Sequence, residues 1–281
     1  MIATAEARER LSLPRPVSAL LAGCAPVAAA VARPRRRWPA VALVWSAHMW
    51  AYKTCFEIPY DRPEQLRRRL RIDPPIRADT LIGRGRPPSQ RLQERLRRPP
   101  HLSGLDRAAT ALYLLWELEP HLALAWVLAR HPERFRRSAL QLGLTFDLTL
   151  VGYALFPTAP PWWASEQAGR MGGSVRRVTF EVIADAKGDP RPEGDHKSGN
   201  NPWASMPSDH FASAVAAATL LARLNRRAGA LAWSYALLLG AILVYTGEHY
   251  VIDLLAGLGV AVAADATTHL LEDAFTALPH S

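Results

Sequence analysis

Long apolar runs separated by arginine-rich loops are the feature that most limits how this 281-residue chain can fold. A soluble domain does not carry several runs of about 17–25 residues with few charges, because a helical run of that length matches the hydrocarbon core of a bilayer. The sequence therefore predicts an all-α membrane protein. Its six predicted spans cover residues 38–56, 108–129, 138–156, 207–224, 230–247 and 248–271.

Two longer hydrophilic segments lie between the predicted spans. Residues 57–107 are rich in arginine and proline, and residues 157–206 form a second polar loop that begins with a proline-rich run. Proline removes a backbone donor and breaks a helix, so the third span is expected to stop there. We expect residues 1–37 to be a basic N-terminal segment, cytoplasmic or interfacial, and residues 38–281 to form one integral membrane catalytic domain.

The net charge of the chain is +9, and nearly all of it comes from arginine. A basic balance can indicate binding to nucleic acid, to an anionic membrane or to acidic substrates. The apolar runs favour the membrane, and the sequence contains no recognisable nucleic-acid-binding module or zinc-finger spacing. A phospholipid is therefore the expected partner, and no nucleic acid is expected.

The number of spans places two histidines on one side of the membrane. His210 stands at the start of the fourth predicted span and His249 at the start of the sixth, so one out-and-back excursion separates them. Short loops on the opposite side, such as residues 130–137, are arginine-rich, which favours the cytoplasm for that side. The long basic loop 57–107 argues the other way, but long loops count less in this rule. We expect a multi-pass protein of the cell membrane with an extracytoplasmic active site.

His249 and Asp253 are four residues apart, so a helix places their side chains on one face, one turn apart. A carboxylate beside an imidazole holds its tautomer and stabilises the positive charge that develops when the other ring nitrogen attacks or takes a proton. A structural polar pair at a helix start would have the same spacing. The second histidine on the same side favours the catalytic interpretation.

The residues before His210 suit a helix start that binds phosphate. We expect Pro207 in the first helical turn and Ser205 at the N-cap. Such a helix start offers unpaired N–H groups, and Ser208 adds a hydroxyl donor. His210 would then protonate the leaving oxygen as a general acid.

Two other interpretations of these residues stay open. His210 could be an interfacial histidine without chemistry. His210, His249 and Asp253 could also hold zinc or iron, but two histidines and one aspartate recur often by chance. Phosphoryl transfer is therefore favoured over a metal site.

The motifs resemble a known family. Pro207-Ser208-x-His210 and His249-x-x-x-Asp253 resemble the second and third motifs of the type 2 phosphatidic acid phosphatase superfamily. Residues 156–162, 206–208 and 247–250 resemble more closely the branch that contains inositol-phosphorylceramide synthase, the target of aureobasidin A. The resemblance covers roughly residues 57–272, and the combination of motifs is much stronger than each motif alone.

This resemblance implies a six-transmembrane-helix bundle that works without a metal or other cofactor. It implies that His249 attacks phosphorus to give a phosphohistidine, that Asp253 supports it, and that His210 serves the leaving group. The group then passes to water or to a lipid or sugar hydroxyl, including inositol-phosphoryl transfer from phosphatidylinositol. Hydrolysis of phosphatidic acid or an isoprenyl diphosphate is the alternative. An anionic-lipid-binding membrane protein without enzyme activity is an alternative of another class.

The chain departs from the family pattern at the phosphate-binding positions. Asp209 replaces the usual glycine, and Leu243 replaces the usual arginine six residues before His249. The Asp209 carboxylate is expected to turn away from the phosphate and complement the helix dipole, so that Asp209→Gly is tolerated. Something must still neutralise the phosphate, and we expect Arg77 and Lys197 to do so. A solvated basic loop on an anionic membrane is the alternative for each of them.

Overall fold

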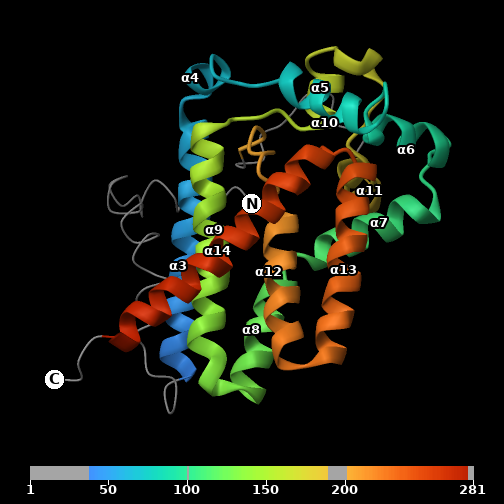
Figure 1. Cartoon of the computed structure of the whole chain (residues 1–281). Helices are drawn as coiled ribbons and strands as arrows, with labels where there is room; N and C mark the ends of the chain where they lie inside the picture. The colour runs from blue at the N-terminus through green and yellow to red at the C-terminus, as the bar shows by residue number, and fades with distance from the viewer. Residues whose placement is uncertain (1–37, 100, 189–200, 278–281) are drawn as a thin grey trace.

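The computed structural model describes residues 38–99, 101–188 and 201–277, and every named element in these ranges is a helix (Figure 1). The predictions for residues 1–37 and for Lys197 fall outside the described residues. The longer helices form a bundle, and the short helices gather at one of its ends (Figure 1). The helices of the bundle are α3 (Trp38–Glu57), α7 (Gly104–Leu115), α8 (Glu119–Arg130), α9 (Phe135–Leu155), α12 (Asp209–Leu224), α13 (Arg226–Tyr245) and α14 (Val251–Ala277).

Three stretches of the described chain are long and apolar enough to cross a membrane, namely Pro132–Leu155, Arg226–Tyr245 and Val251–Glu272. They contain α9, α13 and most of α14, which correspond to the third, fifth and sixth predicted spans. The first and fourth predicted spans are helical as α3 and α12, but neither helix is among the three. The chain is thus a helical membrane protein, and the count of six spans stays a prediction.

The second predicted span is wrong as a continuous helix, because it consists of α7 and α8 with a break at residues 116–118. Pro120 is the second residue of α8. Proline has no N–H to donate, and its ring clashes with the carbonyl four residues earlier, which belongs to Trp116. Tight i→i−3 bonds close the end of α7, such as the one from the Glu117 N–H to the Leu114 carbonyl at 3.2 Å. The break turns Trp116 and Glu117 toward the cavity described below.

In their described residues, the two predicted polar loops contain several short helices, which corrects the sequence-based prediction. The first contains η2 (Ile58–Asp61), α4 (Pro63–Arg67), α5 (Asp73–Ile82) and α6 (Pro88–Leu96), and the second contains α10 (Pro161–Glu166), η4 (Arg170–Gly173) and α11 (Val178–Lys187). α4, α5, α6 and α10 each carry proline at one of the first two helical positions, where a missing N–H removes no helical bond. The prolines that suggested loops therefore begin helices.

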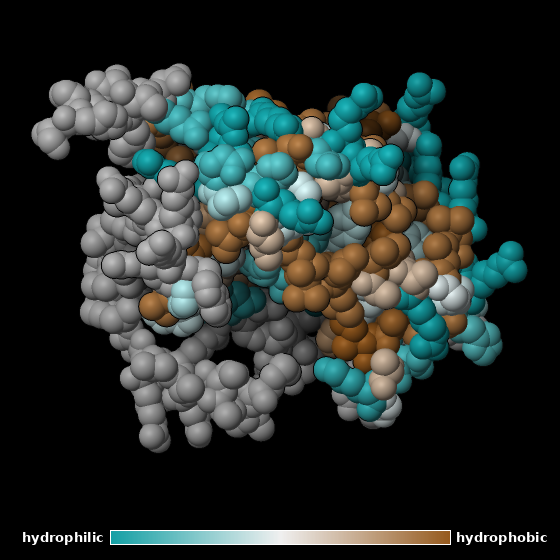
Figure 2. Space-filling model, turned by 90° about the horizontal axis from the view of Figure 1, so that it is seen from below, coloured by the Kyte–Doolittle hydropathy of each residue, from teal (hydrophilic) through white to brown (hydrophobic). Residues whose placement is uncertain are grey.

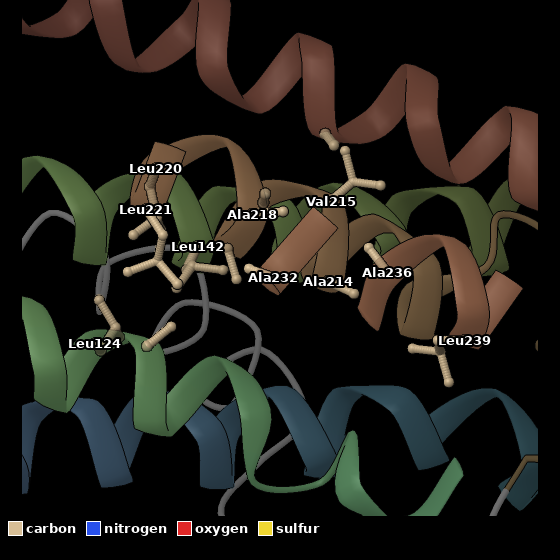
Figure 3. Packing of buried hydrophobic residues seen from close by; sticks show 14 of the residues in the cluster. Leu124, Leu142, Ala214, Val215, Ala218, Leu220, Leu221, Ala232, Ala236 and Leu239 are labelled. Atoms are coloured by element: carbon tan, nitrogen blue, oxygen red, sulfur yellow. The ribbon is translucent and has the colours of Figure 1, made fainter. Parts of the chain in front are cut away.

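The core lies around α12, which packs against α8, α9, α13 and α14 (Figure 3). Alanine is abundant on α12, and small residues allow the helices to approach closely. A Cβ added at Gly229 of α13 would lie 2.3 Å from the Ala222 Cα, so no larger residue fits there. Seen from the end opposite the short helices, hydrophobic side chains form a broad patch between hydrophilic ones (Figure 2).

Candidate active site

A cavity of about 240 Å³ lies at the end of the bundle where the short helices gather. Its walls come from α3, from the break between α7 and α8, from α9, from the start of α12 and from the junction of α13 and α14. The aromatic residues of the lining are Tyr52, Phe56, Tyr113, Trp116, Phe146, Tyr153, Trp162 and Phe180. The ionisable side chains in the lining are Lys53, Glu117, His121, Arg177, Asp209, His210, Glu248 and His249.

The two predicted histidines meet in this cavity, as the span count predicts. The His249 Nε2 atom lies 3.2 Å from the His210 Nδ1 atom. The His210 ring also packs against Tyr113, at 5.2 Å between centroids, and against Trp116, at 4.1 Å. These aromatic rings fix the plane of the His210 imidazole beside His249.

Asp253 lies behind His249 and is fully buried. Its Oδ2 atom is 3.4 Å from the His249 Nδ1 atom and accepts hydrogen bonds from the Tyr250 N–H at 2.9 Å and the Ser205 hydroxyl at 2.6 Å. The carboxylate is therefore held by α14's own first turn and by the loop before α12. His249 thus has one ring nitrogen toward a fixed carboxylate and the other toward the cavity.

The junction between α13 and α14 holds His249 in place. Gly247 has a φ of +78°, which favours glycine, and an added Cβ would meet the Arg176 carbonyl oxygen at 2.7 Å. The Gly247 carbonyl accepts a hydrogen bond from the Trp162 N–H at 3.0 Å. The segment from α10 to α11 is thereby fastened over the junction and contributes a wall of the cavity.

The start of α12 differs from the prediction. The helix begins at Asp209 with Ser208 as the N-cap, and the Ser208 hydroxyl accepts a hydrogen bond from the Phe211 N–H at 3.3 Å. Pro207 precedes the cap, so its placement in the first turn and that of Ser205 at the N-cap were wrong. Ser208 is fully buried and does not line the cavity, whereas Ser205 does. The phosphate-binding role predicted for Ser208 therefore has no geometric support.

Arg77 is exposed on α5 and does not line the cavity. The buried Asp79, two residues later, turns inward toward the start of α14. Two residues correspond to about 200° around a helix, so Arg77 lies on the opposite face. The structure thus does not bring Arg77 to the histidines, and the prediction for Lys197 lies in residues that it does not describe.

Arg177 and Lys53 bring positive charge to the cavity instead. The Arg177 guanidinium lies over the Trp162 ring, 4.6 Å from its centroid, and its Nε atom is 3.0 Å from a Glu248 carboxylate oxygen. Burial lowers the pKa of Arg177, but the neighbouring Glu248 outweighs that effect and leaves the pKa above its ordinary value. The arginine therefore stays charged. The general excess of arginine in the loops was the one sequence signal for it.

The Asp209 carboxylate lies in the cavity wall, which corrects the expectation that it turns away. Its Oδ2 atom accepts a short hydrogen bond from the Tyr52 hydroxyl of α3. Its Oδ1 atom is buried and has no hydrogen-bond partner in the described part of the chain. Asp209 and His210 are adjacent on α12, so their side chains point in directions about 100° apart around the helix axis. The Asp209 carboxylate, which is an acceptor, and the His210 imidazole therefore face different walls of one cavity.

The alternative of a metal site depends on clustered ligands. Among the residues that the structure describes, no group of three or more His, Cys, Asp or Glu side chains is arranged to hold a metal ion. In particular, Asp253 faces the Nδ1 atom of His249, and His210 faces the Nε2 atom. The three side chains thus form a relay through the imidazole of His249 and do not converge on one point.

The chain shows similarity to known proteins. The chain resembles the crystal structure of Aquifex aeolicus LpxE at 20% sequence identity and a TM-score of 0.43, over 64% of this chain and 91% of that chain. No curated protein matches it. The family model of the PAP2 superfamily matches residues 90–267, which include His210, His249 and Asp253. Because this match covers more than half of the sequence, the chain belongs to the PAP2 superfamily, the type 2 phosphatidic acid phosphatases that its motifs resemble.

Proposed function

We propose that this protein is a membrane enzyme that removes or transfers the phosphoryl group of a lipid phosphate ester through a phosphohistidine on His249. Membership of the PAP2 superfamily supports phosphatase-type chemistry, and the membrane-length helices support a lipid substrate. One observation carries the proposal: the Nδ1 atom of His249 faces Asp253 at 3.4 Å while its Nε2 atom opens toward His210 in the cavity. This arrangement turns the nucleophilic nitrogen of His249 toward the cavity, and a phosphate bound beside both imidazoles would replace their direct contact of 3.2 Å.

In the first step the His249 Nε2 atom attacks phosphorus, and the bond from phosphorus to the ester oxygen breaks. His210 gives a proton to that oxygen, so the alcohol leaves uncharged. Asp253 stabilises the positive charge that develops on the His249 ring, and Ser205 keeps the carboxylate in place. The N–P bond of the phosphohistidine is the product of this step.

In the second step a hydroxyl group enters where the alcohol left. His210, which is now neutral, takes the proton of that hydroxyl, and its oxygen attacks phosphorus while the N–P bond breaks. Both histidines return to their starting protonation states. The same residues therefore serve both halves of the reaction.

Arg177 and Lys53 are the proposed phosphate-binding cations, in the place of the predicted Arg77 and Lys197. Both line the cavity that contains the histidines, on walls formed by different parts of the chain. A guanidinium can donate two parallel hydrogen bonds to phosphate oxygens. Charge from two sides would stabilise the transition state, in which negative charge spreads over the phosphate oxygens.

Hydrolysis is the first candidate for the second step, because superfamily membership supports a phosphatase. Transfer to a lipid or sugar hydroxyl, such as inositol-phosphoryl transfer from phosphatidylinositol, is the second candidate. It is favoured by the hydrogen-bonding groups Asn201, Ser205, Asp209 and Glu248 in the cavity lining, since they match the hydroxyls of a polyol. We place the active site on the extracytoplasmic side, following the arginine-rich short loops of the opposite end.

The test is to trap the intermediate on purified protein in detergent. Radiolabelled lipid phosphate is added, the reaction is stopped with alkali, and acid-labile phosphate on the protein is measured. We expect labelling of the wild-type protein and none of His249→Gln, which keeps the size of the side chain. Turnover by His249→Gln at the wild-type rate would overturn the proposal. Free phosphate among the products identifies hydrolysis, and a new phosphodiester identifies transfer.

A further inference from the structure

A second cavity, of about 290 Å³, lies at the opposite end of the bundle. It is lined by polar side chains of η3 (Pro132–Arg134), α9, α12 and α14, namely Arg134, Arg137, Ser138, Gln141, Arg223 and His269. The first four recur at helical spacing, so they form one stripe at the start of α9. Arg223 comes 13 residues after His210 on α12, which separates this cavity from the histidines by about 20 Å. It is thus a distinct site.

The charge in this cavity is only partly neutralised. The Arg137 Nη1 atom lies 2.9 Å from a Glu272 carboxylate oxygen, and Arg223 makes two parallel contacts with Asp265, at 2.5 and 2.7 Å. Arg134 makes no ion pair with an acidic side chain in the described part of the chain. Among the described side chains, two carboxylates therefore face three guanidinium groups in this cavity, which leaves a net positive charge.

Gln141 provides an independent sign of a ligand. The residue is 1% exposed, and its Nε2 amide group is buried with no hydrogen-bond partner in the described part of the chain. Buried polar groups are nearly always hydrogen-bonded, because an unpaired one is costly. Gln141 is one of the residues that line the cavity, so a ligand that enters would supply the missing acceptor.

We propose that this cavity binds the phosphate of an anionic phospholipid headgroup. Guanidinium groups match phosphate oxygens in geometry and charge, and the Gln141 amide adds a neutral donor. Leu220 and Leu224 also line the cavity and give the glycerol part of the lipid an apolar wall. Basic pockets between membrane helices on the cytoplasmic side bind anionic headgroups in this way. The alternative is that these arginines only orient the protein in the membrane. That role would not require the unpaired, buried amide of Gln141 in the same cavity.

The test is lipid binding by the full chain in a neutral detergent, with phosphatidylglycerol as the probe and phosphatidylcholine and inorganic phosphate as comparisons. Native mass spectrometry gives the dissociation constant and the number of bound lipids. We expect Arg134→Gln to weaken phosphatidylglycerol binding about tenfold, the loss of one charge-assisted contact. Gln141→Leu should have a similar effect. Arg136→Gln, which removes the same charge from a neighbour outside the cavity, should change binding less than about twofold.

Several results would overturn the inference. One is unchanged phosphatidylglycerol binding in Arg134→Gln, which is exposed enough to be replaced without unfolding. Another is an equally large loss of phosphatidylglycerol binding in Arg136→Gln, which would show that surface charge alone explains the effect. A third is weaker phosphatidylglycerol binding in Arg177→Gln while Arg134→Gln binds like the wild type, which would assign the lipid to the other cavity. Binding of inorganic phosphate as tight as that of the lipid would assign the site to a free anion.

Discussion

The Asp79 Oδ2 atom accepts a hydrogen bond of 3.0 Å from the Val251 N–H, and its Oδ1 atom accepts one of the same length from the Ile252 N–H. These are the first two N–H groups of α14, the helix that carries Asp253. A residue of α5 therefore caps a helix that lies far away along the chain. Asp79 is fully buried, so no water replaces it. The position of Asp253 behind His249 depends on this cap.

Asp79→Ala should destabilise the protein and misplace the site. Two buried N–H groups would lose their acceptor, at a cost of about 1–3 kcal/mol. We expect a lower midpoint of thermal unfolding in detergent and a lower kcat. Asp79→Asn keeps one acceptor oxygen, so its thermal midpoint and its kcat should both be higher than those of Asp79→Ala. A thermal midpoint of Asp79→Ala equal to that of the wild type would show that the cap contributes nothing.

The stability of the protein should also depend on pH through Asp79. Burial raises the pKa of this carboxyl, the N–H groups of Val251 and Ile252 oppose that rise, and the result is about 6 against an ordinary value of 3.8. Between these two values the folded protein holds a proton that the unfolded chain has lost, so stability falls as the pH rises from 3.8 through about 6. We expect thermal midpoints measured across this range to fall more steeply for the wild type than for Asp79→Asn. Equal slopes would contradict the assignment.

The sequence predicts that the two histidines and the carboxylate of the candidate site lie together, because local rules govern them. Helical spacing joins His249 to Asp253, and the predicted even number of spans between the two histidines places His210 at the same end. The partners Asp79, Arg177 and Ser205 follow no local rule, since each reaches the site from a segment whose packing is set by distant contacts. Prolines such as Pro88 were interpreted as loop residues, although they begin helices. The break before Pro120 was missed because Glu117 and Glu119 were included with Pro120 in one continuous span.

Arg177→Gln should lower kcat/KM about 10²–10³-fold, the loss typical of removing a donor that stabilises a developing anion. Arg176→Gln is the matched control. It removes the same charge one residue earlier, from a side chain that does not line the cavity and instead contacts Glu166 and Glu181. Steady-state kinetics with a soluble short-chain lipid phosphate measures both. A similar loss in both variants would point to a change in the fold of this segment.

Ser205 and Ser208 form a second matched pair. Ser205→Ala removes the 2.6 Å hydrogen bond to Asp253, so the carboxylate is held less firmly and kcat should fall about tenfold with little change in KM. Ser208→Ala removes the N-cap of α12 and should lower the free energy of unfolding by about 1 kcal/mol while kcat is retained. Equal kcat values for the two variants would show that Ser205 does not position Asp253.

The hydrogen bond from the Tyr52 hydroxyl to Asp209 should couple the effects of these two side chains on stability. Asp209→Gly, which restores the residue usual in the superfamily, leaves the buried Tyr52 hydroxyl without an acceptor and should cost about 1–3 kcal/mol of stability. Tyr52→Phe removes the donor in turn. The double variant should be more stable than the sum of the two changes predicts, because neither partner is then left alone. Unfolding midpoints of the four proteins measure this coupling. Phosphohistidine formation on His249 should persist in Asp209→Gly, since no step above passes through Asp209. Complete loss of the phosphohistidine in that variant, with the fold intact, would give the Asp209 carboxylate a part in the chemistry itself.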